Sequence, residues 1–225
     1  KHFKVSSLIG MGLDDFAAGL IAAGALMQYL QDTQKISLAH FTHLYPYATG
    51  KYMLLDSSTR RNLELTETLR EKQKRGSLLW VLDKTKTAMG ARTLRHFIEQ
   101  PLIYKDDIEY RQNAVEALLK DSISRDELRE YLNPIYDMER LLSKVSYQSI
   151  NPRDMIAFRN SLEMLPHIKS VLESFETPQI VALREEIDDL KDVFQMIFDC
   201  IVEEPPLQSK EGGIIKEGYN SDIDY

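Results

Sequence analysis

The chain has 225 residues, of which 43% are hydrophobic, enough to bury a sizeable core in one or two domains. Its 28 basic and 35 acidic side chains leave a formal net charge of −7, so the chain as a whole repels a phosphate backbone, and any contact with nucleic acid must be local. No apolar run approaches the roughly 20 residues that cross a bilayer, and the first residues lack a signal peptide. We therefore expect a globular, cytoplasmic protein without membrane contact.

The first predicted element is a helix over residues 13–30, where apolar and small side chains recur at helical spacing. Its alanines and glycines would let it lie close against a neighbouring element. Residues 36–41 and 52–56 are short apolar runs that predict two strands, separated by a turn around residues 46–50.

From residue 57 onward the pattern predicts one helix after another. Ser77 and Thr87 precede apolar runs and are expected to be helix N-caps, and Pro101 is expected to end the second of these helices. Asp106 or Asp107 should start a helix with an apolar stripe at the following positions: Ile108, Val115, Leu118 and Leu119.

Further helix starts are predicted along the rest of the chain. Ser124 with Glu127 has the spacing of a capping box, and Asn151 precedes Pro152 at a first helical position. A long helix is expected from residues 177–178 to about residue 202. Pro205 and Pro206 should then stop it, before a glycine-rich connection with a short strand at Ile214 and Ile215.

The two ends of the chain indicate a piece of a longer protein. Lys1 is not a start methionine, and near the last residues Asn220, Ser221 or Asp222 could cap a helix that is about to begin. The single cysteine, Cys200, excludes an internal disulfide and fits a reducing compartment. Apolar residues surround it at helical spacing, so we expect a buried, unreactive thiol.

A search for catalytic groups finds no persuasive set. Of the five histidines, only His40 and His43 are close together, and they lack carboxylate or cysteine partners for a metal. The glycine pair Gly10 and Gly12 lacks the third glycine of a dinucleotide fingerprint, and Gly50 with Lys51 does not complete a P-loop. The acidic run at 185–192 is typical of a solvated helix face. No catalytic, cofactor-binding or metal-binding residue is predicted.

Basic residues gather between positions 60 and 75, where six cations face three glutamates, a local charge of +3. These basic residues are Arg60, Arg61, Arg70, Lys72, Lys74 and Arg75. They could contact DNA phosphate, or they could be structural and pair with neighbouring acids, for instance Glu67 with Arg70 and Glu71 with Arg75. No interleaved aromatic residues supply a stacking platform, and pairing is the favoured interpretation.

Several stretches together resemble the MutS family of bacterial mismatch-repair proteins. They are "LLDSSTRRNLELTETL", "GSLLWVLDKTKTAMGARTLRHFIEQPL", "IEYRQNAVEAL", "DMERLLSKVS", "NPRDM" and "GGIIKEGYNSDID", in this order and at matching spacing. The earlier "GLDDFAAGLIAAGALMQYLQDTQK" resembles the end of the family's connector domain. The resemblance spans nearly the whole chain, but no mismatch-reading or ATP-binding motif of the family is present.

The resemblance implies a mainly α fold: an irregular helical bundle of the core and lever type, preceded by a small α/β remnant of the connector domain. The expected boundaries are 1–55 for the end of the connector and 56–225 for the core and lever domain. The full-length protein would be a dimeric ATPase that binds mismatched double-stranded DNA, uses ATP and Mg, and meets a MutL-type partner through the connector. It would be bacterial, cytoplasmic and nucleoid-associated.

On this interpretation the segment transmits motion and has no catalytic site, cofactor or metal of its own. Two helices would be locked into one structural core by Leu79, Trp80, Leu82, Met89, Leu94, Phe97 and Ile98. Thr87, Asn151 and Pro152 would fix helix starts, and Arg60 and Arg61 would orient the chain leaving the connector. Replacing a buried Trp80 by alanine would then uncouple ATP state from DNA release.

Two alternatives remain open at this stage. One is a stand-alone helical module that binds a partner protein through an apolar stripe. The other is a DNA-binding domain that acts through residues 60–75, which a steep salt dependence of duplex binding would reveal.

Overall fold

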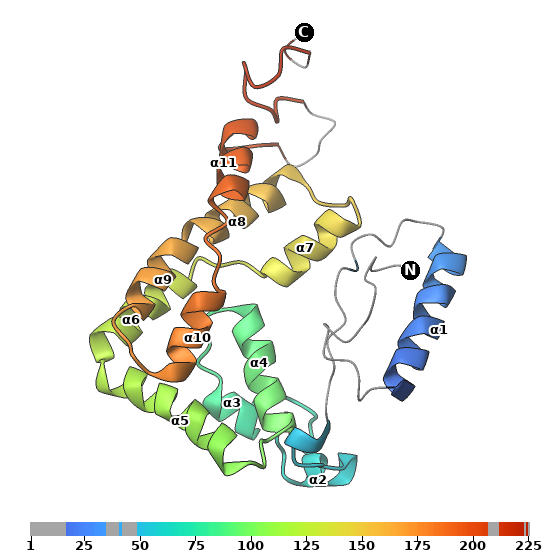
Figure 1. Ribbon diagram of the computed structural model, residues 1–225, viewed down its shortest axis with the longest axis vertical. Helices are drawn as coiled ribbons and strands as arrows, with labels where there is room; N and C mark the ends of the chain where they lie inside the picture. Colours follow the sequence, from blue (N-terminus) through green and yellow to red (C-terminus); the bar gives the residue numbers. More distant parts are fainter. Residues whose placement is uncertain (1–16, 35–40, 42–48, 207–211, 223, 225) are drawn as a thin grey trace. The chain divides into compact units, whose positions relative to one another are not determined.

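The computed structural model describes residues 17–34, 41, 49–206, 212–222 and 224. The chain divides into two compact units, Lys1–Gly50 and Lys51–Tyr225. Helices dominate the described residues, and isolated bridges are their only β pairing, which confirms the predicted mainly α class (Figure 1).

In the first unit, α1 (Ala17–Gln34) confirms the predicted helix and continues it by four residues. Side chains in and before this extension form hydrogen bonds between positions four residues apart. Gln28 donates to Asp32 at 3.0 Å, and the Thr33 hydroxyl donates to the Tyr29 carbonyl at 2.8 Å. The start predicted at residue 13 lies outside the described residues, as does the strand predicted at 36–41 apart from Phe41. The short η2 (Thr49–Lys51) spans the unit boundary.

The second unit begins without the strand predicted over 52–56. Only one antiparallel bridge forms there, between Tyr52 and Leu102, supported by a 2.7 Å bond from the Met53 N–H to the Pro101 carbonyl. The strand cannot extend because Asp56 already caps α2 (Ser57–Asn62), accepting from the Thr59 N–H at 2.6 Å.

The next two helices begin as predicted. Ser77 caps α3 (Leu78–Leu82) by accepting from the Trp80 N–H, and Thr87 caps α4 (Ala88–Glu99) by accepting from the Gly90 N–H. Helix α4 ends at Glu99, two residues before the proline expected to end it. These caps are local bonds between a hydroxyl and a backbone N–H three residues on, so the sequence predicts them well.

The following pair, α5 (Lys105–Lys120) and α6 (Ser122–Leu132), departs from the prediction. Neither Asp106 nor Asp107 caps α5, because both lie in its first turn. The capping box predicted for Ser124 and Glu127 is wrong, since Asp121 caps α6 and accepts from both the N–H and the hydroxyl of Ser124.

The apolar stripe predicted on α5 is also partly wrong. Val115 and Leu119 are 61% and 68% exposed, while Ile108 and Leu118 are half-buried. The small Ala114 is the buried residue of this helix, and it belongs to a hydrophobic core with Ile168 and Ile180.

Three helices follow: α7 (Met138–Ser146), α8 (Pro152–Glu163) and α9 (Leu165–Leu172). The start of α8 is as predicted, with Pro152 in the first turn. Asn151 accepts from the Asp154 N–H at 2.7 Å, and the Asp154 carboxylate accepts from the Asn151 N–H at 3.4 Å, which completes a capping box.

The long helix predicted from residues 177–178 to about 202 is wrong, because it is two helices, α10 (Pro178–Glu186) and α11 (Lys191–Cys200). Leu190 interrupts them in the left-handed region, at φ 47°. Lys169 stabilises the break from α9 by donating to the Ile187 carbonyl at 3.0 Å. After α11, the predicted strand at Ile214 and Ile215 is a single bridge between Ile201 and Ile215.

The second unit contains two hydrophobic clusters. Cluster 1 has the buried residues Ala114, Ile135, Ile168, Leu172, Phe175 and Ile180. Cluster 2 has the buried residues Leu141, Phe158, Leu162, Ile197 and Ile201. Met138 packs against both clusters, and α8 and α9 follow one another with only Met164 between them. The clusters are therefore joined along the chain at two places.

The end of α7 is a Schellman motif with an unusual residue at its left-handed position. Gln148 has φ 53°, its N–H donates to the Val145 carbonyl, and the Ser149 N–H donates to the Lys144 carbonyl at 2.9 Å. Glycine is the common residue there, because a side chain strains the left-handed conformation. The Gln148 side chain is exposed.

We expect Gln148→Gly to raise the free energy of unfolding by about 0.5–1 kcal/mol, because it removes that strain. Gln148→Ala is the matched control: it also removes the amide but keeps a Cβ, so it should bring no gain. Urea unfolding of both variants measures the difference. Equal stability of the two would contradict the conformational explanation.

Candidate functional site

The described residues offer no cluster of titratable side chains that resembles a catalytic or metal centre. Within 17–34, 49–206 and the short described stretches, no three His, Cys, Asp or Glu side chains are placed to hold a metal ion. Nor is any helix of this part long and apolar enough to cross a membrane. His40, His43, Gly10 and Gly12 lie outside the described residues. The prominent polar features are charged contacts between helices.

The basic residues at 60–75 are mostly solvent-exposed. Arg60 donates from Nε to the Leu55 carbonyl at 3.0 Å, and Lys74 pairs with Asp83. The other four, Arg61, Arg70, Lys72 and Arg75, have no side-chain partner among the described residues.

The predicted pairs of Glu67 with Arg70 and Glu71 with Arg75 do not form among these described residues. The reason is conformational, because residues 63–76 form a loop in which side chains three or four positions apart do not share a helix face. Thr68 closes the loop, since its N–H donates to the Gln73 carbonyl at 2.9 Å.

The predicted core of α3 and α4 is only partly buried. Leu79 is 4% exposed, and Met89, Leu94, Phe97 and Ile98 are partly buried. Trp80 and Leu82, however, are 48% and 50% exposed, so the expectation that they are locked inside the core is wrong.

The shortness of α3 explains this exposure. A helix of five residues turns only one position fully inward, and Leu79 occupies it. Trp80→Ala would therefore leave no internal cavity in this unit. Phe97 on α4 instead meets the Arg111 guanidinium of α5, 3.5 Å from the ring centroid.

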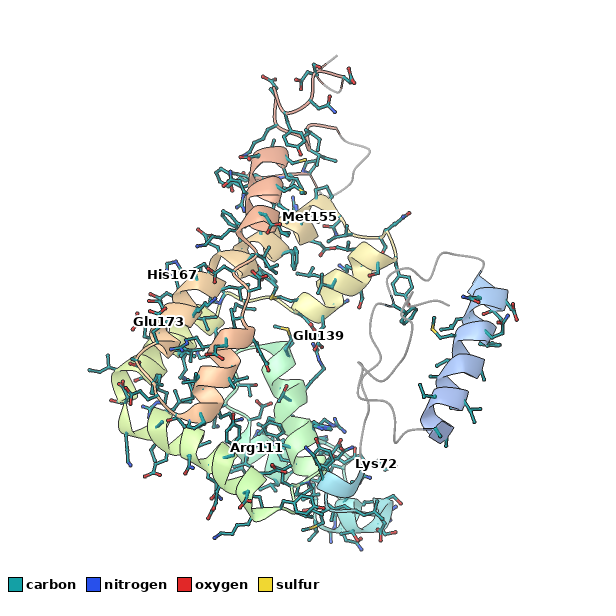
Figure 2. The ribbon with its side chains drawn as sticks, in the orientation of Figure 1. Lys72, Arg111, Glu139, Met155, His167 and Glu173 are labelled. Atoms are coloured by element: carbon teal, nitrogen blue, oxygen red, sulfur yellow. The ribbon has the colours of Figure 1, made fainter. Side chains whose placement is uncertain are left out.

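A charged clamp joins α4 to the start of α7. Arg92 donates two bonds to the Asp137 carboxylate, at 2.7 and 2.8 Å, and a third to Glu139 at 2.6 Å. Glu139 lies at the start of α7, close to α4 (Figure 2). The bidentate pair lowers the pKa of the Asp137 carboxyl. Asp137 also caps α7 by accepting from the Arg140 N–H, so one carboxylate fixes both the helix start and its neighbour.

The linker between α6 and α7, residues 133–137, is held on several sides. Ile135 is buried in cluster 1, and the Tyr136 N–H donates to Ser161 Oγ at 3.0 Å. Ser161, on α8, is fully buried and its hydroxyl donates to the Ala157 carbonyl. The linker therefore cannot shift without disturbing α8.

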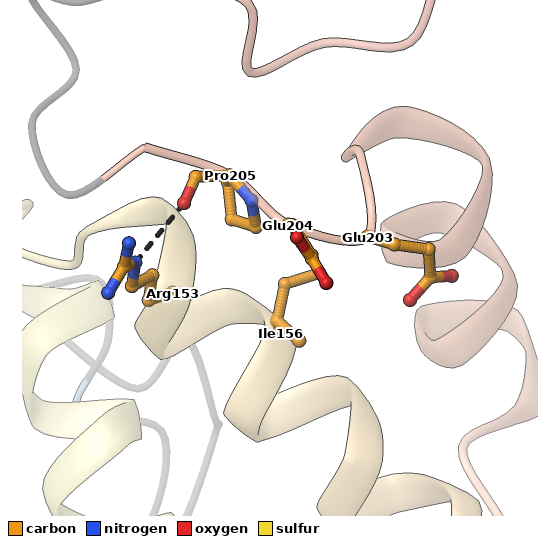
Figure 3. A pocket seen from close by; sticks show the side chains of 5 residues that line it. All are labelled: Arg153, Ile156, Glu203, Glu204 and Pro205. Atoms are coloured by element: carbon orange, nitrogen blue, oxygen red, sulfur yellow. Dashed lines mark hydrogen bonds between the residues drawn. The ribbon is translucent and has the colours of Figure 1, made fainter.

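A shallow pocket lies between α8 and the segment after α11, lined by Arg153, Ile156, Glu203, Glu204 and Pro205 (Figure 3). The Arg153 Nε donates to the Pro205 carbonyl at 3.1 Å across its edge. Beside it, Glu203 pairs with the buried Arg159 of α8.

Sequence reasoning missed Arg92, Asp137, Arg159 and Glu203. A signal was present for one of them, because Arg159 lies between Phe158 and Leu162 on the apolar face of α8. A buried arginine requires an acidic partner. The partner itself lies 44 positions away in sequence, a distance that no local pattern reveals.

The Lys74–Asp83 pair gives a test of the local electrostatics. Lys74, and then Thr85, donate to the Asp83 carboxylate and lower its pKa from 3.8 to about 2. We expect Lys74→Met to move this pKa back towards 3.8, and the exposed Lys72→Met to leave it unchanged. An NMR titration of the Asp83 carboxyl measures both.

The same pair predicts a pH dependence of stability. A lowered folded-state pKa contributes stability above about pH 4, and this stability is lost as pH falls towards 2. The stability difference between the parent chain and Lys74→Met should therefore shrink over that window; a constant difference would contradict the pairing.

Comparison with known proteins identifies a family for this chain. The family model described as MutS domain III matches residues 58–223. The DNA mismatch repair protein MutS of Lachnoclostridium phytofermentans is 60% identical over 224 residues, which cover all of this chain and 24% of the relative. That of Ruminiclostridium cellulolyticum is 50% identical, again over the whole chain and 25% of the relative. The chain spans about a quarter of the length of the curated relatives it matches. It therefore belongs to the MutS family and contains that family's domain III.

Proposed function

We propose that this chain is the structural and motion-transmitting segment of a DNA mismatch repair protein. Its residues 1–55 would be the end of the connector domain, and residues 56–225 the core and lever domain. Its relatives are DNA mismatch repair proteins MutS, which supports this assignment. The full-length protein would bind mismatched DNA as a dimer, hydrolyse ATP with Mg and act in the bacterial cytoplasm at the nucleoid. A MutL-type partner would bind through the connector.

One observation carries the mechanical role: the two hydrophobic clusters are joined by the α6–α7 linker and by the α8–α9 junction. Met138 packs against both clusters, and the linker before it is bonded to Ser161 and leads into the Arg92 clamp. Close-packed cores have discrete arrangements and do not deform smoothly. A body joined in this way would pass a displacement from one end to the other without absorbing it.

ATP and Mg would be bound by other parts of the full-length protein, in keeping with the resemblance to the MutS family. What this chain's own residues do is hold helices in a fixed relation, chiefly by the clamp of Arg92 and the buried bonds of Ser161.

Two alternatives make different predictions. A stand-alone interaction module would capture a partner without the rest of the protein, and the exposed Trp80 and Val81 give it an apolar surface. A DNA-binding domain would show steep, salt-dependent binding of this chain to duplex DNA through Arg70, Lys72 and Arg75. The overall charge of −7 weighs against the second alternative.

The clamp is testable in the full-length protein. We expect Arg92→Met to weaken the coupling between ATP binding and release from mismatched DNA by about 2- to 30-fold, because the α4–α7 connection loosens. Mismatch affinity without nucleotide should be retained. Stopped-flow release of a labelled mismatched duplex measures the coupling.

Arg95→Met is the matched control, since Arg95 lies on the same helix and, among the described residues, its side chain pairs only with Glu99, one turn away. It should release DNA at the parent rate. If Arg92→Met also releases DNA at the parent rate, the proposed transmission through this clamp is wrong.

A further inference from the structure

We propose, resting on the function proposed above, that Arg159 is a positioning residue. It anchors the chain after α11 to α8, so that movement of residues 212–224 is passed to the helical core. The anchor comprises Arg159, Phe198, Glu203 and Lys216, and we call it the clasp.

The first half of the clasp is a charge pair with one buried partner. Arg159 is 7% exposed on the inward face of α8. Its two terminal nitrogens donate to the two Glu203 oxygens at 2.9 and 2.8 Å, and the Asn160 side chain accepts two further bonds, at 3.3 and 3.0 Å. This bidentate geometry fixes direction as well as distance, because a planar guanidinium meets a planar carboxylate.

The second half holds the terminal segment against the end of α11. The Val202 N–H donates to the Ile214 carbonyl at 3.0 Å, and the Lys216 N–H donates to the Cys200 carbonyl at 2.9 Å. The Lys216 ammonium also donates to the Phe198 carbonyl at 2.5 Å. Three bonds thus tie residues 214–216 to α11 and the two residues after it.

The Phe198 ring connects the two halves. The Lys216 ammonium lies 4.2 Å from its centroid and the Arg159 guanidinium carbon 5.6 Å from it. Two cations on one aromatic ring are stabilised by its negative face, and Glu203 balances them. Arg159 first, and then Lys216, lower the pKa of the Glu203 carboxyl, so the carboxylate is charged at neutral pH.

Residues 218–222 and 224, described directly after the clasp, are the segment that it holds. Asn220 accepts from the Asp222 N–H through its side chain at 3.0 Å and from the Asp224 N–H through its carbonyl at 3.2 Å. Residues 220–222 thus lie in a hydrogen-bonded turn, and no helix is assigned to the described residues after α11. The clasp lies directly before this turn, so a displacement of the turn would pull on the core.

The direct test is Glu203→Gln in the full-length protein, which removes the charge and keeps the shape. We expect ATP-triggered release from mismatched DNA to slow by about tenfold, while mismatch affinity and ATP turnover, each measured alone, stay within twofold. Glu203→Asp, which keeps the charge on a side chain one methylene shorter, should restore part of the lost release rate. Such a rescue would not accompany a merely structural packing role.

Glu204→Gln is the matched control, because Glu204 lines the same pocket and makes no bond to Arg159 among the described residues. It should release DNA normally. If Glu203→Gln fails to fold, Lys216→Met tests the other half of the clasp and should also slow release.

Normal release in Glu203→Gln, or in Lys216→Met where the first variant fails to fold, would overturn the inference. The function itself is tested separately by Arg92→Met. A slowed Arg92→Met beside a normal Glu203→Gln would refute the clasp alone, whereas normal release in both would refute the transmission role as well.

Discussion

The packing that joins the two hydrophobic clusters of the second unit is the constraint on which the rest of its structure depends. Met138 belongs to the packing of both clusters, and the linker that leads to it is bonded to the buried Ser161 of α8. The helices around one cluster are therefore positioned relative to those around the other cluster through packed side chains. The linker between them is itself bonded to α8. This is the property that a force-transmitting segment needs.

Charged contacts between helices fix how the packed helices are oriented relative to one another. The Arg92 clamp sets α4 against the start of α7, Lys144 pairs with the capping carboxylate Asp154 at the start of α8, and Arg159 holds the chain after α11. Each involves an acid at or just beyond a helix end. Asp137 and Asp154 also accept from a backbone N–H at their own helix start, so these two carboxylates serve both a local and a distant partner. The bidentate pairs of Arg92 and Arg159 fix the direction as well as the distance between the segments that they join.

Helix caps that depend on neighbouring residues were predictable from the sequence, whereas features that depend on contacts between distant segments were not. The caps at Ser77, Thr87 and Asn151 depend on bonds within three residues, and the resemblance to the MutS family identified the helical class. The break between α10 and α11 is bonded by Lys169 from another helix, and Trp80 lies on the exposed side of the short helix α3. The Arg159–Glu203 pair spans 44 positions, so only the need of a buried arginine for a partner could be anticipated.

The most direct test of the central claim is a distance across the two clusters in the full-length protein. Spin labels would replace the exposed Leu119 of α5 and Met196 of α11, whose helices belong to cluster 1 and cluster 2 respectively. Pulsed electron-spin resonance would then compare the nucleotide-free, ADP and ATP-analogue states bound to mismatched DNA. Two clusters that move as one body predict a single narrow distance in all three states. A distance that shifts or broadens with nucleotide would contradict the account.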